Sequence, residues 1–198
     1  MKRKLYRLAM MASMLLPTPF AHATIIEYVA NLNGSNELPV NFSPATGFAV
    51  ITIDDVLNTM MLNVTFSGLL GATTVTHIHC CTATPLMGTV GVATAIPNLS
   101  GFPPGVMSGT YLNTLDMTQA TSYNANFITA NGGTPATAQA FLFNGISLGG
   151  AYLNIHTTQF PGGEIRGFLT QVPEPATLAL IGIGMIGIGY QRRRGAKA

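Results

Sequence analysis

The residues best suited to chemistry are three histidines in two short segments, His77-Ile78-His79 and Tyr152-Leu153-Asn154-Ile155-His156-Thr157. Side chains two positions apart in a strand point to the same face, so His77 and His79 lie together, with Cys81 beside them if the strand continues. Paired histidines at this spacing commonly begin a zinc or copper site. Two interpretations stay open. The three imidazoles hold copper or zinc, completed by Cys81 or solvent, or each ring bonds to backbone or Asn154 in a polar seam.

The two cysteines of the chain, Cys80 and Cys81, are adjacent. An exported protein can carry disulfides, but neighbours in an extended strand point to opposite faces, and a ring closed between them needs unfavourable geometry. Three states of these cysteines stay open: a pair of free thiols, one thiolate that binds a metal, or an intermolecular disulfide. A buried Cys80 without a reactive role is the most common outcome for such a residue.

A second motif, Gly163-Glu164-Ile165-Arg166-Gly167, follows the last histidine. Glu164 and Arg166 are two residues apart, so in a strand they share a face. A partly buried arginine needs a carboxylate, and Glu164 is the nearest in sequence. We therefore expect an internal ion pair that fixes the hairpin, with Gly162 and Gly163 supplying turn conformations closed to other residues.

The charge of the chain lies almost entirely at its ends. Eight of its nine lysines and arginines lie in the first seven positions or after Tyr190, which leaves Arg166 as the only one between residues 24 and 171. That stretch also holds six carboxylates, so its formal charge is −5. Nucleic-acid binding is excluded because phosphate neutralisation needs several basic side chains on one face. Residues 24–171 contain no lysine and therefore cannot form a Schiff base with a substrate. The adjacent Asp54 and Asp55 indicate a turn rather than an acid–base pair.

Periodicity predicts the elements that must position these residues. Alternating or continuous apolar patterns predict strands at residues 25–32, 46–53, 59–67 and 75–80, weaker strands at 89–96 and 106–112, and a final pair at 151–157 and 164–169. A first helix begins at Asp116 or Thr118 and ends near Ile128, and a second runs from Pro135, capped by Thr134, through Phe143. We expect a mainly β fold: an antiparallel β-sandwich or flattened barrel with one or two short helices inserted late.

Both ends carry targeting signals. The order at the N-terminus is a basic region, an apolar run at residues 8–16 and Ala21-His22-Ala23, as in a secretory signal peptide cleaved after Ala23. At the other end, Pro173-Glu174-Pro175 precede an apolar run at 176–190 and the basic cluster Arg192-Arg193-Arg194. That run is shorter than the ~20 residues that span a bilayer, which favours a transient stop in the inner membrane. We expect a signal peptide at 1–23, an exported domain at 24–171, and a sorting segment with a short hydrophobic helix at 172–198.

Two family resemblances follow from these motifs. The tail resembles the PEP-CTERM sorting signal of Gram-negative bacteria, in which Pro-Glu-Pro is the processing motif, and this implies a protease or transpeptidase of the exosortase type as a partner. The order His-x-His, Tyr-Leu-Asn-Ile-His-Thr and Gly-Glu-Ile-Arg-Gly resembles the CHRD domain, named for chordin, over about residues 25–169. For bacterial members the resemblance implies an exported domain without an established reaction.

Two functional hypotheses result. The first is a non-catalytic CHRD-like protein, secreted or retained at the cell envelope, that binds a partner or associates with the matrix; the sorting signal suggests exopolysaccharide. The second is a periplasmic or surface metalloprotein that uses the histidines to hold copper or zinc.

Overall fold

The computed structural model describes residues 25–173. The expected signal peptide with Ala21 and Ala23, the apolar run at 176–190, Glu174, Pro175 and Arg192-Arg193-Arg194 lie outside the described residues. Within residues 25–173, no helix is long and apolar enough to cross a membrane.

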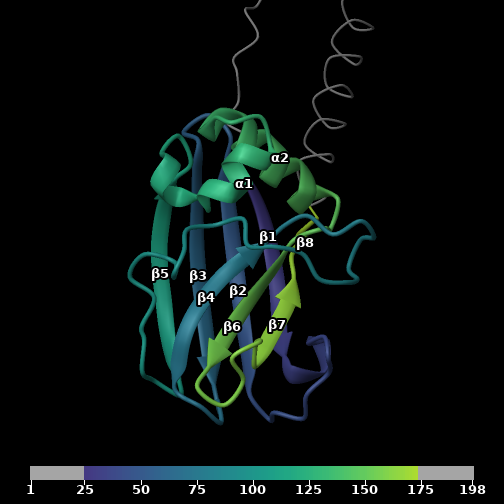
Figure 1. The fold of residues 1–198 in the computed structure, drawn as a ribbon, viewed down its shortest axis with the longest axis vertical. Helices are drawn as coiled ribbons and strands as arrows, with labels where there is room; N and C mark the ends of the chain where they lie inside the picture. Colours follow the sequence, from purple (N-terminus) through teal and green to yellow (C-terminus); the bar gives the residue numbers. More distant parts are fainter. Residues whose placement is uncertain (1–24, 174–198) are drawn as a thin grey trace, which may run out of the picture.

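The described chain forms one curled antiparallel sheet with two short helices, which confirms the predicted fold class (Figure 1). The eight-stranded sheet has the order β4-β6-β7-β1-β2-β3-β5, and β8 pairs with β1. Its strands are β1 (Ile25–Asn33), β2 (Thr46–Asp54), β3 (Thr59–Ser67), β4 (Thr73–His79), β5 (Gly109–Asp116), β6 (Tyr152–Thr157), β7 (Ile165–Phe168) and β8 (Thr170–Gln171).

Strict alternation places the core on the inner face of the sheet. On β3, Met60, Leu62, Val64 and Phe66 are buried, while Thr65 and the other intervening residues face outward. The predicted turn after β2 is confirmed, because Asp54 Oδ1 accepts hydrogen bonds from the backbone amides of Val56 and Leu57. These features are local, and the sequence pattern predicts them well.

An irregular segment at residues 80–108 runs along the free edge of β4 and contributes Leu99 and Phe102 to the core. The predicted strand at 89–96 is wrong: the segment makes only isolated bridges, such as His79 with Val92. Elsewhere single hydrogen bonds hold the segment to β4. Some are between backbone groups, such as Leu99 N donating to Thr76 O, and others involve side chains, such as Ile78 N donating to Thr94 Oγ1. Tyr111 of β5 donates to Ser100 O, so the segment joins the two edge strands of the curled sheet.

The helices α1 (Ala125–Ala130) and α2 (Pro135–Ser147) lie together at one end of the sheet (Figure 1). The second begins as predicted, with Thr134 forming a capping box and Pro135 in the first turn. The first begins later than predicted. Asp116 is the last residue of β5, its carboxylate holds the turn at Thr118, and a 3₁₀ turn (Ala120–Ser122) precedes the Asn124 cap of α1. A second 3₁₀ turn, Gly34–Asn36, follows β1.

Candidate metal centre

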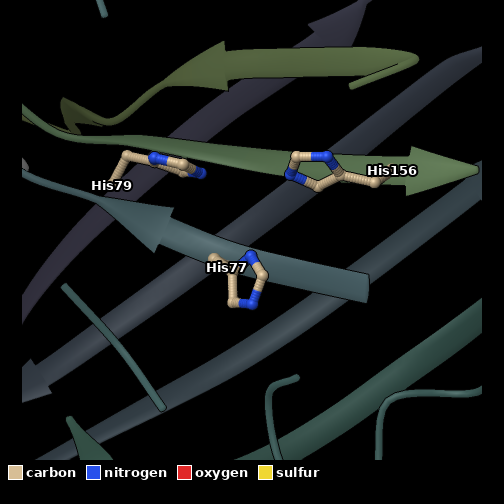
Figure 2. Close-up of side chains that lie close together, drawn as sticks. All are labelled: His77, His79 and His156. Atoms are coloured by element: carbon tan, nitrogen blue, oxygen red, sulfur yellow. The ribbon is translucent and has the colours of Figure 1, made fainter. Parts of the chain in front are cut away.

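The pairing of β4 with β6 brings the three predicted histidines together. Opposite residues in this pair are His77 with Asn154 and His79 with Tyr152. Ile78 and Ile155 point into the core, so the histidines occupy the opposite face of the two strands. Figure 2 shows His77 and His79 side by side from β4, with His156 projecting from β6 toward them. One ring nitrogen from each histidine lies within 4.8 Å of those of the other two.

Backbone carbonyls hold the three rings in the same manner. His77 Nε2 bonds to Pro97 O, His79 Nδ1 to Val90 O and His156 Nδ1 to Pro161 O, each at 2.8 Å. A carbonyl only accepts, so the bonded nitrogen of each ring carries the proton. In a neutral imidazole the second nitrogen then presents a lone pair.

Those second nitrogens have no partner. His77 Nδ1, His79 Nε2 and His156 Nε2 are buried and make no hydrogen bond within the described part of the chain. Metal-binding histidines usually donate their other ring N–H to a carbonyl or carboxylate, which fixes the tautomer and aims the free nitrogen. The centre has that arrangement three times over.

Electrostatics keeps the rings neutral. Burial lowers the pKa of His79 to about 4, with further lowering by His77, His156 and Arg166, against the raising effect of its bond to Val90 O. Burial also lowers the pKa of His77 and of His156. At neutral pH all three therefore offer lone pairs, the protonation state that a metal ligand needs.

Cys81 does not join the histidines, because it forms a disulfide with Cys80. The expectation that neighbouring cysteines stay unlinked assumed a continuing strand, but β4 ends at His79. Strand alternation, which would point the two sulfurs apart, therefore does not apply to them. The sulfurs pack against Gly145 of α2, where the lack of a side chain leaves them room.

The predicted ion pair between Glu164 and Arg166 is also wrong. Glu164 precedes the first residue of β7, so strand alternation does not place its side chain beside Arg166. Its fully buried carboxylate accepts from two hydroxyls, Ser43 and Thr157, and from the amides of Leu70 and Gly71. Four donors thus satisfy this carboxylate, and they join the end of β6 and the loop that leads into β4 to the segment that precedes β2.

Arg166 pairs instead with Glu37, which reasoning from the sequence did not assign to this motif. The two side chains are about equally buried, and Arg166 Nε lies 3.7 Å from Glu37 Oε2. Burial raises the pKa of Glu37 to about 7, against the lowering effects of Arg166 and of Asn154, whose Nδ2 donates to the carboxylate. No local signal identifies this partner, because Glu37 lies in the turn after β1 and reaches Arg166 only through sheet pairing.

The remaining motif residues have structural positions next to this pair. Gly163 has φ of 127°, as expected for a glycine turn, and a Cβ there would lie 2.6 Å from Asn154 Nδ2. The same expectation is wrong for Gly162, which is not at positive φ and where a Cβ would meet no atom within 4 Å. A Cβ on Gly167 would lie 2.5 Å from the Asn31 carbonyl of β1. Asn154 Oδ1 is buried without a hydrogen-bond partner within the described residues.

Comparison with known proteins assigns both parts of the chain. The CHRD domain profile matches residues 28–169, and the PEP-CTERM protein-sorting motif matches residues 171–194. No curated protein and no solved structure matches the chain. The sorting motif implies an exported, envelope-associated protein processed by an exosortase-type enzyme. Because the domain profile covers well over half of its length, the chain belongs to the CHRD domain family.

Proposed function

We propose that this exported CHRD protein binds one copper or zinc ion through His77, His79 and His156. The observation that carries the proposal is the set of three converging ring nitrogens, each buried and without a partner, on rings whose opposite nitrogens donate to carbonyls. Three neutral imidazoles are a ligand set that suits both metals. Solvent or a small ligand would complete the coordination.

The alternative, a purely structural polar seam, gives hydrogen-bond partners to only three of the six ring nitrogens. It requires each ring to be satisfied by backbone or by Asn154, yet Asn154 donates to Glu37. Three buried nitrogens would remain unpartnered, and each such group costs about 1–3 kcal/mol of stability. A bound metal ion removes that cost for all three at once.

The exported location supports this choice. The sorting motif is typical of an exported, envelope-associated protein. An exported protein can keep a disulfide, and the bond between Cys80 and Cys81 leaves the three imidazoles as the ligand set. Passage through the inner membrane by residues 176–190 and association with exopolysaccharide are further proposals, supported by the position and type of the sorting motif.

Copper titration with electron paramagnetic resonance tests the site. The exported chain should take up about one equivalent of Cu²⁺ with hyperfine splitting from several nitrogens. His77→Ala, His79→Ala and His156→Ala should each weaken binding strongly, whereas Asn63→Ala, on the outer face of β3, should not. Thermal unfolding of each variant confirms that it is folded. Uptake that is not saturable, or that survives all three histidine substitutions in folded protein, would refute the proposal.

A further inference from the structure

We propose that a pocket beside Arg166 binds a small carboxylate that has an apolar body. The pocket has a volume of about 410 Å³ and is bounded by β1, β7 and the loop that contains Leu86 and Met87. Arg166 forms part of its wall although the residue is only 4% exposed. None of the three histidines lines this pocket, so the proposed ligand does not need the metal ion.

Unused hydrogen-bond donors are the first argument. A guanidinium has five N–H groups in a planar fork. Arg166 Nε donates to Asn36 O, and Nη1 donates to Gly88 O at 3.2 Å. Nη2 makes no hydrogen bond to the described residues, and it is not one of their fully buried polar atoms that lack a partner, so a ligand can reach it. Three N–H groups therefore remain for a ligand that enters the pocket.

Charge is the second argument. Arg166 is the only lysine or arginine between residues 24 and 171. The carboxylate of Glu37 lies on the Nε side and also accepts from Asn154. Because burial raises the pKa of Glu37 to about 7, only part of the positive charge of Arg166 is balanced near neutral pH. The remaining charge favours an anion on the Nη side.

The lining of the pocket favours a carboxylate that carries an apolar body over a compact inorganic anion. A carboxylate matches the two terminal nitrogens of the fork with two parallel hydrogen bonds. Phe168 lines the pocket and lies against the guanidinium, 5.8 Å from its centre, so an apolar or aromatic body can pack beside the charged group. Leu86 and Met87 extend this apolar wall, and the exposed Asn31 side chain makes no hydrogen bond to described residues.

Calorimetric titration of the exported chain with benzoate tests the proposal, with benzamide as the neutral analogue and inorganic phosphate as a non-planar anion. Asn31→Asp adds a negative charge at the pocket without touching Arg166. Asn63→Asp makes the same charge change on β3, at a position that does not line this pocket. Benzoate should bind saturably, benzamide and phosphate far more weakly. Asn31→Asp should weaken benzoate binding by about tenfold or more, and Asn63→Asp by less than about twofold.

Arg166→Met should abolish benzoate binding if the variant folds, and Asn31→Asp keeps the test decisive if it does not. Three results would overturn the proposal: no saturable benzoate binding, equal binding of benzamide or phosphate, or equal effects of the two Asn→Asp variants.

Discussion

The neutral, buried state of His79 predicts how stability of the metal-free protein depends on pH. Burial lowers its pKa from 6.5 to about 4 in the folded state. Between these values the unfolded chain binds more protons than the folded chain, so the free energy of unfolding falls as the pH falls. For His79 alone, the loss between about pH 7 and about pH 4.5 amounts to about 2 kcal/mol.

Glu37 acts in the opposite direction. Burial raises its pKa from 4.5 to about 7, so over the same range the folded chain binds more protons than the unfolded one. This group stabilises the protein as the pH falls, by a similar amount. The lowered pKa values of His77 and His156 act in the same direction as that of His79. The profile of the unsubstituted protein alone therefore cannot isolate His79, and a difference between variants is required.

The contribution of His79 can be isolated by comparing urea unfolding of the metal-free protein with that of His79→Gln at the two pH values. The difference in free energy of unfolding between the unsubstituted protein and His79→Gln should be smaller by about 2 kcal/mol at about pH 4.5 than at about pH 7. The reason is that only the unsubstituted protein loses stability by keeping His79 neutral at the lower pH. Thr65→Ser, an exposed change on β3, should show a constant difference. A cost of His79→Gln that stays the same at both pH values would refute the argument from burial.

Two further substitutions test the packing around the site. Gly145→Ala should destabilise the protein by about 2 kcal/mol or more, because the new Cβ would lie 2.5 Å from Cys80 Sγ. Helix propensity alone predicts the opposite, a gain of about 1 kcal/mol. Thermal unfolding measures the change, and Gly162→Ala is the neutral control because its Cβ would meet no atom within 4 Å. Glu164→Gln should lower the free energy of unfolding in urea by about 3 kcal/mol, because the new NH₂ group would replace a carboxylate oxygen that accepts from donors such as Leu70 N. A loss below about 1 kcal/mol would contradict the assigned hydrogen bonds.

Local signals made much of the fold predictable. The alternation through Met60 and Phe66 identifies β3, the carboxylate of Asp54 marks the turn before it, and Thr134 with Pro135 marks the start of α2. Each of these features depends on residues only a few positions apart. The apolar pattern at 89–96 predicts a strand, but the segment forms only isolated bridges, with His79 of β4 and with Tyr123.

The site was predictable only in part, for the same reason. Alternation along one strand predicts that His77 and His79 share a face. Their approach to His156 needs the register between β4 and β6, which no local pattern encodes. The pairing of Arg166 with Glu37 likewise depends on sheet topology, and proximity in sequence pointed wrongly to Glu164.

The metal content of the exported chain tests the central claim most directly. The protein should be purified from an export-competent host without chelator or metal-affinity resin and measured by elemental analysis beside His79→Ala. We predict about one equivalent of copper or zinc, absent from the variant while its fold remains intact. Folded protein that carries no metal, and that takes none up when copper or zinc is supplied, would contradict the account and leave the histidines as structural residues.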